Sequence, residues 1–117
     1  MSTSIIFIVF VWAHFVGDFI LQSDYHAINK SKNFWVLLQH VFFYVLPFLF
    51  LLFFMPALFV AKFIAINYVL HVITDFVSSK LTTKLWKANQ RHWFFVVIGA
   101  DQAIHFTCLF LSFMLLA

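Results

Sequence analysis

Four long apolar runs dominate this sequence and restrict the kind of fold that the chain can adopt. They cover about residues 4–21, 34–54, 57–77 and 93–116. An apolar segment of roughly 20 residues is long enough to cross the hydrocarbon core of a bilayer as a helix. Only 9% of the residues are charged, whereas a soluble domain carries about 25%. We therefore predict an all-α, polytopic membrane protein, in which residues 1–117 form a single transmembrane domain, a bundle of four transmembrane helices.

The Lys and Arg residues are concentrated between the apolar runs and predict an orientation. Six of the seven lie in the connections after the first and third runs, which share one side of the membrane in a four-span chain. Lys and Arg are enriched in cytoplasmic loops. We expect a multi-pass protein of the inner (plasma) membrane, with loops 22–33 and 78–92 cytoplasmic and both termini outside. The first run has no Lys or Arg before it, so we expect it to be retained rather than cleaved as a signal peptide.

The segment after the third run predicts contact with lipid headgroups. Within residues 80–91, basic residues recur at helical spacing with Leu and Trp between them. This pattern is typical of a short amphipathic helix lying in the membrane interface, where it would contact anionic headgroups. We expect the bilayer to be its partner, and we expect no nucleic-acid partner. In the second run, Pro47 predicts a kink.

Three of the runs carry an acid and a histidine four residues apart. The pairs are His14 with Asp18, His71 with Asp75, and Asp101 with His105. Four residues are about one helical turn, so both members of each pair project from one helix face. The second run adds His40.

Depth in the bilayer predicts that these residues meet. Counted from the cytoplasmic end of its own helix, each lies about one to three turns in, at roughly 1.5 Å per residue. An Asp near a helix centre is disfavoured by about 2.5–3.5 kcal/mol on insertion scales, so three together require compensating positive charge. No Lys or Arg lies at this depth, and the expected counter-charge is therefore divalent metal ions or protons, including protons held on the histidines.

Imidazole and carboxylate together suit divalent zinc, iron or manganese, which the residue types do not distinguish. Ligands one helical turn apart can share one ion, and four-helix bundles build such centres in their cores. The candidate ligands are His14, Asp18, His40, His71, Asp75, Asp101 and His105. Two further readings stay open: a proton-linked polar network, and hydrogen-bonded pairs that only hold the helices together.

With these residues in view, the sequence resembles an uncharacterised bacterial family of small membrane proteins, the domain-of-unknown-function family 3307. The resemblance rests on HFVGDFILQ at residues 14–22, on Lys30 or Lys32 after it, on His40, on HVITD at residues 71–75 and on DQAIH at residues 101–105. It implies a membrane location and importance for these positions, but no activity.

Three functional hypotheses follow. The first is a metal-dependent hydrolase of a lipid-linked or amphipathic substrate, because a bound metal produces a nucleophilic water at neutral pH. In it, Asp18, Asp75 and Asp101 are candidate general bases as well as ligands, and Gln22 and Gln102 orient ligands or substrate. The second is metal-ion or proton transport, for which a four-helix chain would require a homo-oligomer. The third is a non-catalytic membrane subunit with a structural polar core.

Overall fold

The computed structural model describes residues 2–117, and these residues form helices and short connections with no strand. The elements are α1 (Thr3–Phe15), the π-helical turn η1 (Val16–Ile20), α2 (Asp24–Asn29), α3 (Phe34–Val45), the 3-10 helix η2 (Leu46–Phe53), α4 (Ala57–Lys87) and α5 (Arg91–Leu116). The predicted all-α class is confirmed. Thr3–Ile20, Phe34–Phe53, α4 and α5 are each long and apolar enough to cross a membrane.

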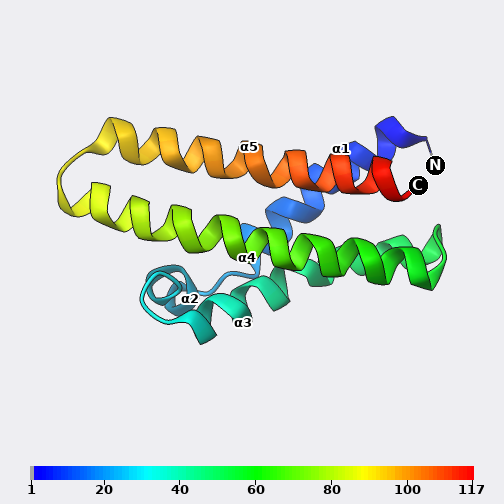
Figure 1. Cartoon of the computed structure of the whole chain (residues 1–117), viewed down its shortest axis with the longest axis horizontal. Helices are drawn as coiled ribbons and strands as arrows, with labels where there is room; N and C mark the ends of the chain where they lie inside the picture. The colour runs from blue at the N-terminus through cyan, green and yellow to red at the C-terminus, as the bar shows by residue number, and fades with distance from the viewer. Residues whose placement is uncertain (1) are drawn as a thin grey trace.

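The helices form an elongated bundle. α4 and α5 run antiparallel along its length, and α1 and α3 pack beside them (Figure 1). The two termini lie together at one end, whereas the α4–α5 turn lies at the opposite end and α2 toward it. The loops predicted to share one side of the membrane therefore lie toward the same end of the molecule.

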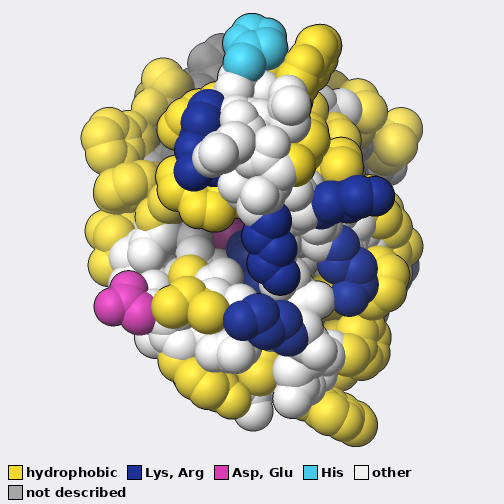
Figure 2. All heavy atoms as spheres, turned by 90° about the vertical axis from the view of Figure 1, so that its left-hand side faces the viewer, with side chains coloured by type: hydrophobic (Ala, Val, Ile, Leu, Met, Phe, Trp, Pro, Cys, Tyr) yellow, Lys and Arg dark blue, Asp and Glu magenta, His cyan; other side chains and the backbone are white. Residues whose placement is uncertain are grey.

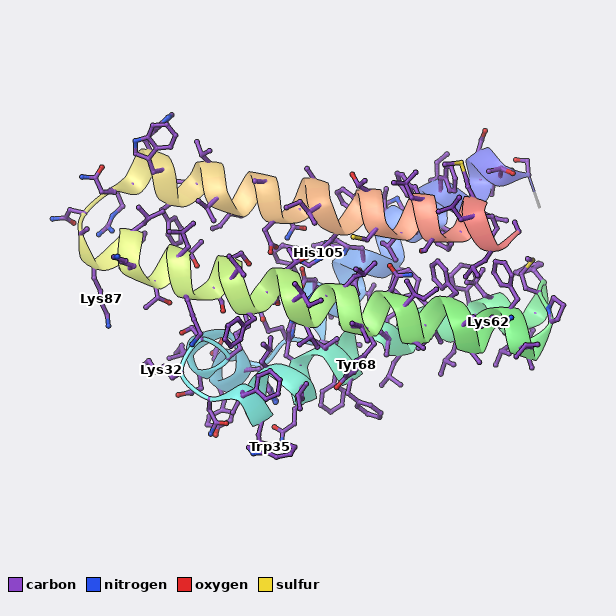
Figure 3. The ribbon with its side chains drawn as sticks, in the orientation of Figure 1. Lys32, Trp35, Lys62, Tyr68, Lys87 and His105 are labelled. Carbon is purple, nitrogen blue, oxygen red and sulfur yellow. The ribbon has the colours of Figure 1, made fainter. Side chains whose placement is uncertain are left out.

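The separate interfacial helix predicted after residue 77 is not present. Instead, α4 continues without a break through Lys80 and Lys84 to Lys87. No Gly or Pro interrupts this stretch, and Lys, Leu and Trp all continue a helix without large penalty. Only Ala88–Gln90 remain as a loop, with Asn89 in the left-handed region at φ 58°. The 31 residues of α4 extend roughly 46 Å at 1.5 Å each, which exceeds a hydrocarbon core of about 30 Å. In Figure 3, Lys87 lies at one tip of the bundle and Lys62 near the other.

Regular α-helix ends in the second run where Pro47 predicted a kink. α3 stops at Val45, and Pro47 occupies the first turn of η2. Proline has no N–H to donate and clashes with the preceding turn, so the chain tightens into 3-10 geometry.

Aromatic rings fill the half of the bundle nearer the termini. Phe10, Phe48 and Phe63 are 0–1% exposed, and Phe113 is 4% exposed. The rings of Phe10 and Phe63 stack with centroids 5.2 Å apart, and Phe113 meets Phe10 edge-on at 5.4 Å. The buried His and Asp side chains lie in the other half.

Candidate metal centre

All three acid–histidine pairs face the interior of the bundle. His14 Nε2 lies 3.5 Å from Asp18 Oδ2, His71 Nε2 lies 3.2 Å from Asp75 Oδ2, and His105 Nε2 lies 3.1 Å from Asp101 Oδ2. These six residues and His40 are all at most 9% exposed. In Figure 3, His105 lies between α4 and α5, midway along the bundle. The one-turn spacing and the depth count thus predicted a single buried cluster correctly.

Four of these residues converge from three different segments. Asp18 from η1, His40 from α3, and His71 and Asp75 from α4 each offer a ligand atom within 4.8 Å of the others. In a tetrahedral site with bonds of about 2.1 Å, neighbouring ligand atoms are roughly 3.4 Å apart. The four nitrogen–oxygen separations within the group run from 2.9 Å, between His40 Nε2 and Asp18 Oδ1, to 3.5 Å, between His71 Nε2 and Asp18 Oδ1. The group could therefore hold a metal ion.

Within this group, His71 has no hydrogen bond. Its imidazole is 2% exposed, and neither Nδ1 nor Nε2 has a hydrogen-bond partner, although Nε2 lies 3.2 Å from Asp75 Oδ2. Buried polar atoms without a partner are uncommon and call for an explanation. A metal ion bound at Nε2 would explain why this nitrogen has no hydrogen-bond partner.

A second group shares Asp18 with the first. Asp18, Asp101 and His105 also place one ligand atom each within 4.8 Å of the others. Asp101 accepts hydrogen bonds from Ser78 Oγ at 2.6 Å and Gln102 Nε2 at 3.1 Å. Asp75 also lies close, with Oδ1 3.2 Å from His105 Nε2.

His14 belongs to neither group, and both of its ring nitrogens have other partners. Nε2 lies 2.6 Å from Gln102 Oε1, and Nδ1 lies 2.9 Å from the Tyr44 hydroxyl. Since Gln102 donates through Nε2 to Asp101 and Asp18, its oxygen must accept, so His14 donates from Nε2 and accepts from Tyr44. His14 thus contacts Gln102, and Gln102 in turn contacts the carboxylates of Asp18 and Asp101.

The expectation that no Lys or Arg reaches the cluster is wrong. Lys30, which follows α2, places Nζ 3.0 Å from Asp75 Oδ2. Burial alone would lower the pKa of this ammonium group, but the nearby carboxylates of Asp75 and Asp18 raise it above its usual value. The prediction counted depth along helices only, whereas a lysine in a loop can extend its long side chain into the core. The motif resemblance had already marked Lys30 or Lys32.

A cavity of about 220 Å³ leads to the cluster from the basic end of the bundle. Its lining includes the three carboxylates, Lys30, Gln22 and hydroxyl side chains of α4. Ser79 Oγ and Gln22 Oε1 are buried in it without hydrogen-bond partners. Figure 2 shows this end, with Lys and Arg side chains around a hollow in which acidic atoms are visible. The cluster can therefore be reached from the basic end of the bundle.

Gly17 allows the helices to approach closely enough to form the site. A Cβ atom at this position would overlap the backbone oxygen of Tyr44 and lie 3.0 Å from its Cα. Gly17 lies in η1, a π-helical turn that also contains Asp18. Such turns are rare and often occur at functional sites. The sequence predicted a regular helix here and missed this turn; Gly17 beside Asp18 was the available signal.

A family model described as "Protein of unknown function (DUF3307)" matches residues 6–117, nearly the whole chain. This match confirms the resemblance drawn from the motifs. No curated protein and no solved structure matches the chain.

Proposed function

The chain belongs to the DUF3307 family, and from its geometry we propose an integral membrane metalloprotein that hydrolyses an amphipathic substrate. The observation that carries the proposal is the convergence of Asp18, His40, His71 and Asp75 beside a cavity open at one end. A divalent ion held there would lower the pKa of a bound water and supply a nucleophile at neutral pH.

Asp101 is the residue best placed to act as general base. It lies outside the four-residue group and lines the cavity. Ser78 and Gln102 donate hydrogen bonds to its carboxylate, which fixes the direction of the oxygens. A positioned carboxylate that is not a ligand can take a proton from a water as it attacks.

An apolar groove beside the cavity supports an amphipathic substrate. The groove, of about 450 Å³, lies between α1, η1 and α5 and includes Trp12, Phe15 and Phe106. It shares Phe19 and Gln102 with the polar cavity. A molecule with a polar head and a hydrocarbon chain could place its head at the metal centre and its chain in the groove.

Transport through the centre of the chain is less well supported. On the side away from the cavity, the polar cluster meets Tyr44, whose ring lies 3.8 Å from that of His71, and then the buried Phe rings. An ion leaving in that direction would have to cross a dry aromatic layer, which is strongly unfavourable.

We propose that the cavity faces the cytoplasm. The Lys and Arg residues at that end support this orientation through the positive-inside rule. The protein would then lie in the inner (plasma) membrane with both termini on the outer side. The exposed basic end of α4, with Lys84 and Lys87, would contact anionic headgroups.

The first test is the metal content of the purified protein. We expect stoichiometric zinc, iron or manganese by elemental analysis in the wild type and strong loss in His71→Ala and Asp75→Asn. His92→Ala is the matched control, because His92 is exposed at the start of α5. A metal-free wild type, or equal metal in all variants, would reject the centre.

The second test separates hydrolysis from transport. Reconstituted wild type should release product from ester or phosphoester lipids, whereas Asp101→Asn should retain metal and lose turnover. Metal-ion flux into vesicles without any turnover would reject the hydrolase in favour of transport.

A further inference from the structure

Lys30 is an internal cation that the proposed chemistry does not use. Its Nζ shares Asp75 Oδ2 with His40, whose Nε2 lies 3.2 Å from the same oxygen. The Lys30 side chain is only 17% exposed. An ammonium group at this depth is therefore part of the charge balance of the cluster.

The loop that carries Lys30 is fixed to α4. Lys80 Nζ donates to the backbone oxygen of Ser31 at 2.9 Å, and Thr83 Oγ1 donates to Ser31 Oγ at 3.3 Å. Before the loop, the Ser23 side chain caps α2 by accepting from the His26 backbone N–H. These contacts fix the backbone next to Lys30, so that its side chain extends into the cavity.

Charge balance suggests what Lys30 does there. Asp18, Asp75 and Asp101 carry three negative charges, and the ammonium leaves a net of two, which one divalent ion neutralises. With Lys30 in place, a second divalent ion would leave two positive charges uncompensated in a low-dielectric interior, where unpaired charge is strongly disfavoured. Without Lys30, two divalent ions and the three carboxylates would leave only one positive charge, which a single bound anion would balance.

Geometry supplies a place for that second ion. Asp18, Asp101 and His105 form the second ligand group, and Asp18 is common to both groups. A carboxylate shared in this way can bridge two metal ions, an arrangement found in many hydrolytic two-metal sites. The second group lines the same cavity through Asp18 and Asp101, beside Lys30.

We propose that Lys30 takes the place of a second metal ion, so that the chain binds one divalent ion and would bind a second at Asp18, Asp101 and His105 if the ammonium were removed. This inference rests on the proposed metal centre. It assigns Lys30 a role in setting the number of ions, distinct from a contact that only stabilises the loop.

The test is a Co²⁺ titration of the full chain in detergent, followed by visible absorption and checked by elemental analysis. We expect an end point of one ion per chain for the wild type and for Lys30→Arg, which keeps the charge. Lys30→Met should bind two. The double variant Lys30→Met with Asp101→Asn should return to one, because it removes a ligand of the second position.

Each outcome bears on a different claim. A wild type that binds one ion together with a folded Lys30→Met that also binds one would overturn the role of Lys30 and leave the metal centre intact. A wild type that takes up two ions in excess Co²⁺ would also overturn it, and this measurement needs no variant. A wild type that binds none would overturn both proposals.

Discussion

Replacing Gly17 by alanine perturbs the contact on which the geometry of the site depends. A Cβ atom there would lie 3.0 Å from Tyr44 Cα and 3.1 Å from its carbonyl carbon, and it would overlap the carbonyl oxygen. Ordinary van der Waals contact begins at 3.4 Å. All three atoms belong to the backbone of α3, so no side chain can rotate away and the helix itself must move by several tenths of an ångström or more.

That movement separates residues that must stay close. The Asp18 to His40 contact of 2.9 Å and the His14 to Tyr44 contact of 2.9 Å both join the segment around Gly17 to α3. Overpacking a well-packed core costs about 1–3 kcal/mol, and we expect Gly17→Ala near the upper end. Metal–ligand distances tolerate shifts of only about 0.2 Å, so metal affinity should fall as well.

Gly99→Ala is the matched control, since the chain has only two glycines. A Cβ atom at Gly99 meets nothing within 4 Å, and alanine raises helix propensity by up to about 1 kcal/mol. We expect Gly99→Ala to be neutral or stabilising. Both variants would be unfolded by SDS titration from mild detergent micelles and assayed for bound metal. If the free energies of unfolding of Gly17→Ala and Gly99→Ala differ by less than about 0.5 kcal/mol and Gly17→Ala keeps its metal, the close contact between Gly17 and Tyr44 does not determine the geometry of the site.

Three further outcomes are expected. Asn67→Ala should lower the free energy of unfolding by about 1–3 kcal/mol in the same titration, because it breaks a buried 2.8 Å hydrogen bond to Ser112; it should leave metal content unchanged, and a loss of metal would contradict this separation. Tyr44→Phe should weaken metal binding by about tenfold in a chelator competition, because His14 loses the partner that fixes its ring, and His14 in turn holds Gln102 against Asp18; unchanged affinity would make this contact dispensable. Metal affinity of the wild type should fall as the pH is lowered, because protons compete with the metal ion for the imidazole nitrogens, and a flat profile would argue against histidine ligands.

The buried cluster of His and Asp residues could be predicted because its members follow helical periodicity. A spacing of four residues fixes the relative direction of His71 and Asp75 in any α-helix, and residue counts fix their depth. Neither inference needs the packing of the bundle. The same reasoning placed His40 at the level of the pairs, where it lies 2.9 Å from Asp18.

Lys30 could not be placed by that reasoning, because it lies outside the long helices. Its position depends on the short helix α2 and on the docking of Ser31 against α4, which are tertiary contacts. The orientation of His14 was equally hidden. Its periodicity is that of a ligand, but Tyr44 and Gln102 occupy both ring nitrogens. Periodicity gives the face on which a side chain lies, and the neighbouring side chains decide which of its atoms remain free.

The hydrogen-bonding state of His71 bears on whether the cluster holds an ion or only protons. If Nε2 carried a proton, the nearest acceptor would be Asp75 Oδ2 at 3.2 Å, yet the contact lacks hydrogen-bond geometry. If Nε2 carried a lone pair, that lone pair would lie close to carboxylate oxygens of Asp75 and Asp18, which repel it. The ring also stacks on His105 with centroids 3.9 Å apart, which disfavours a positive charge on both imidazoles. A cation coordinated by His71 Nε2 and the two carboxylates would remove the repulsion and would give the nitrogen a partner, which favours the proposed metal ion over protons alone.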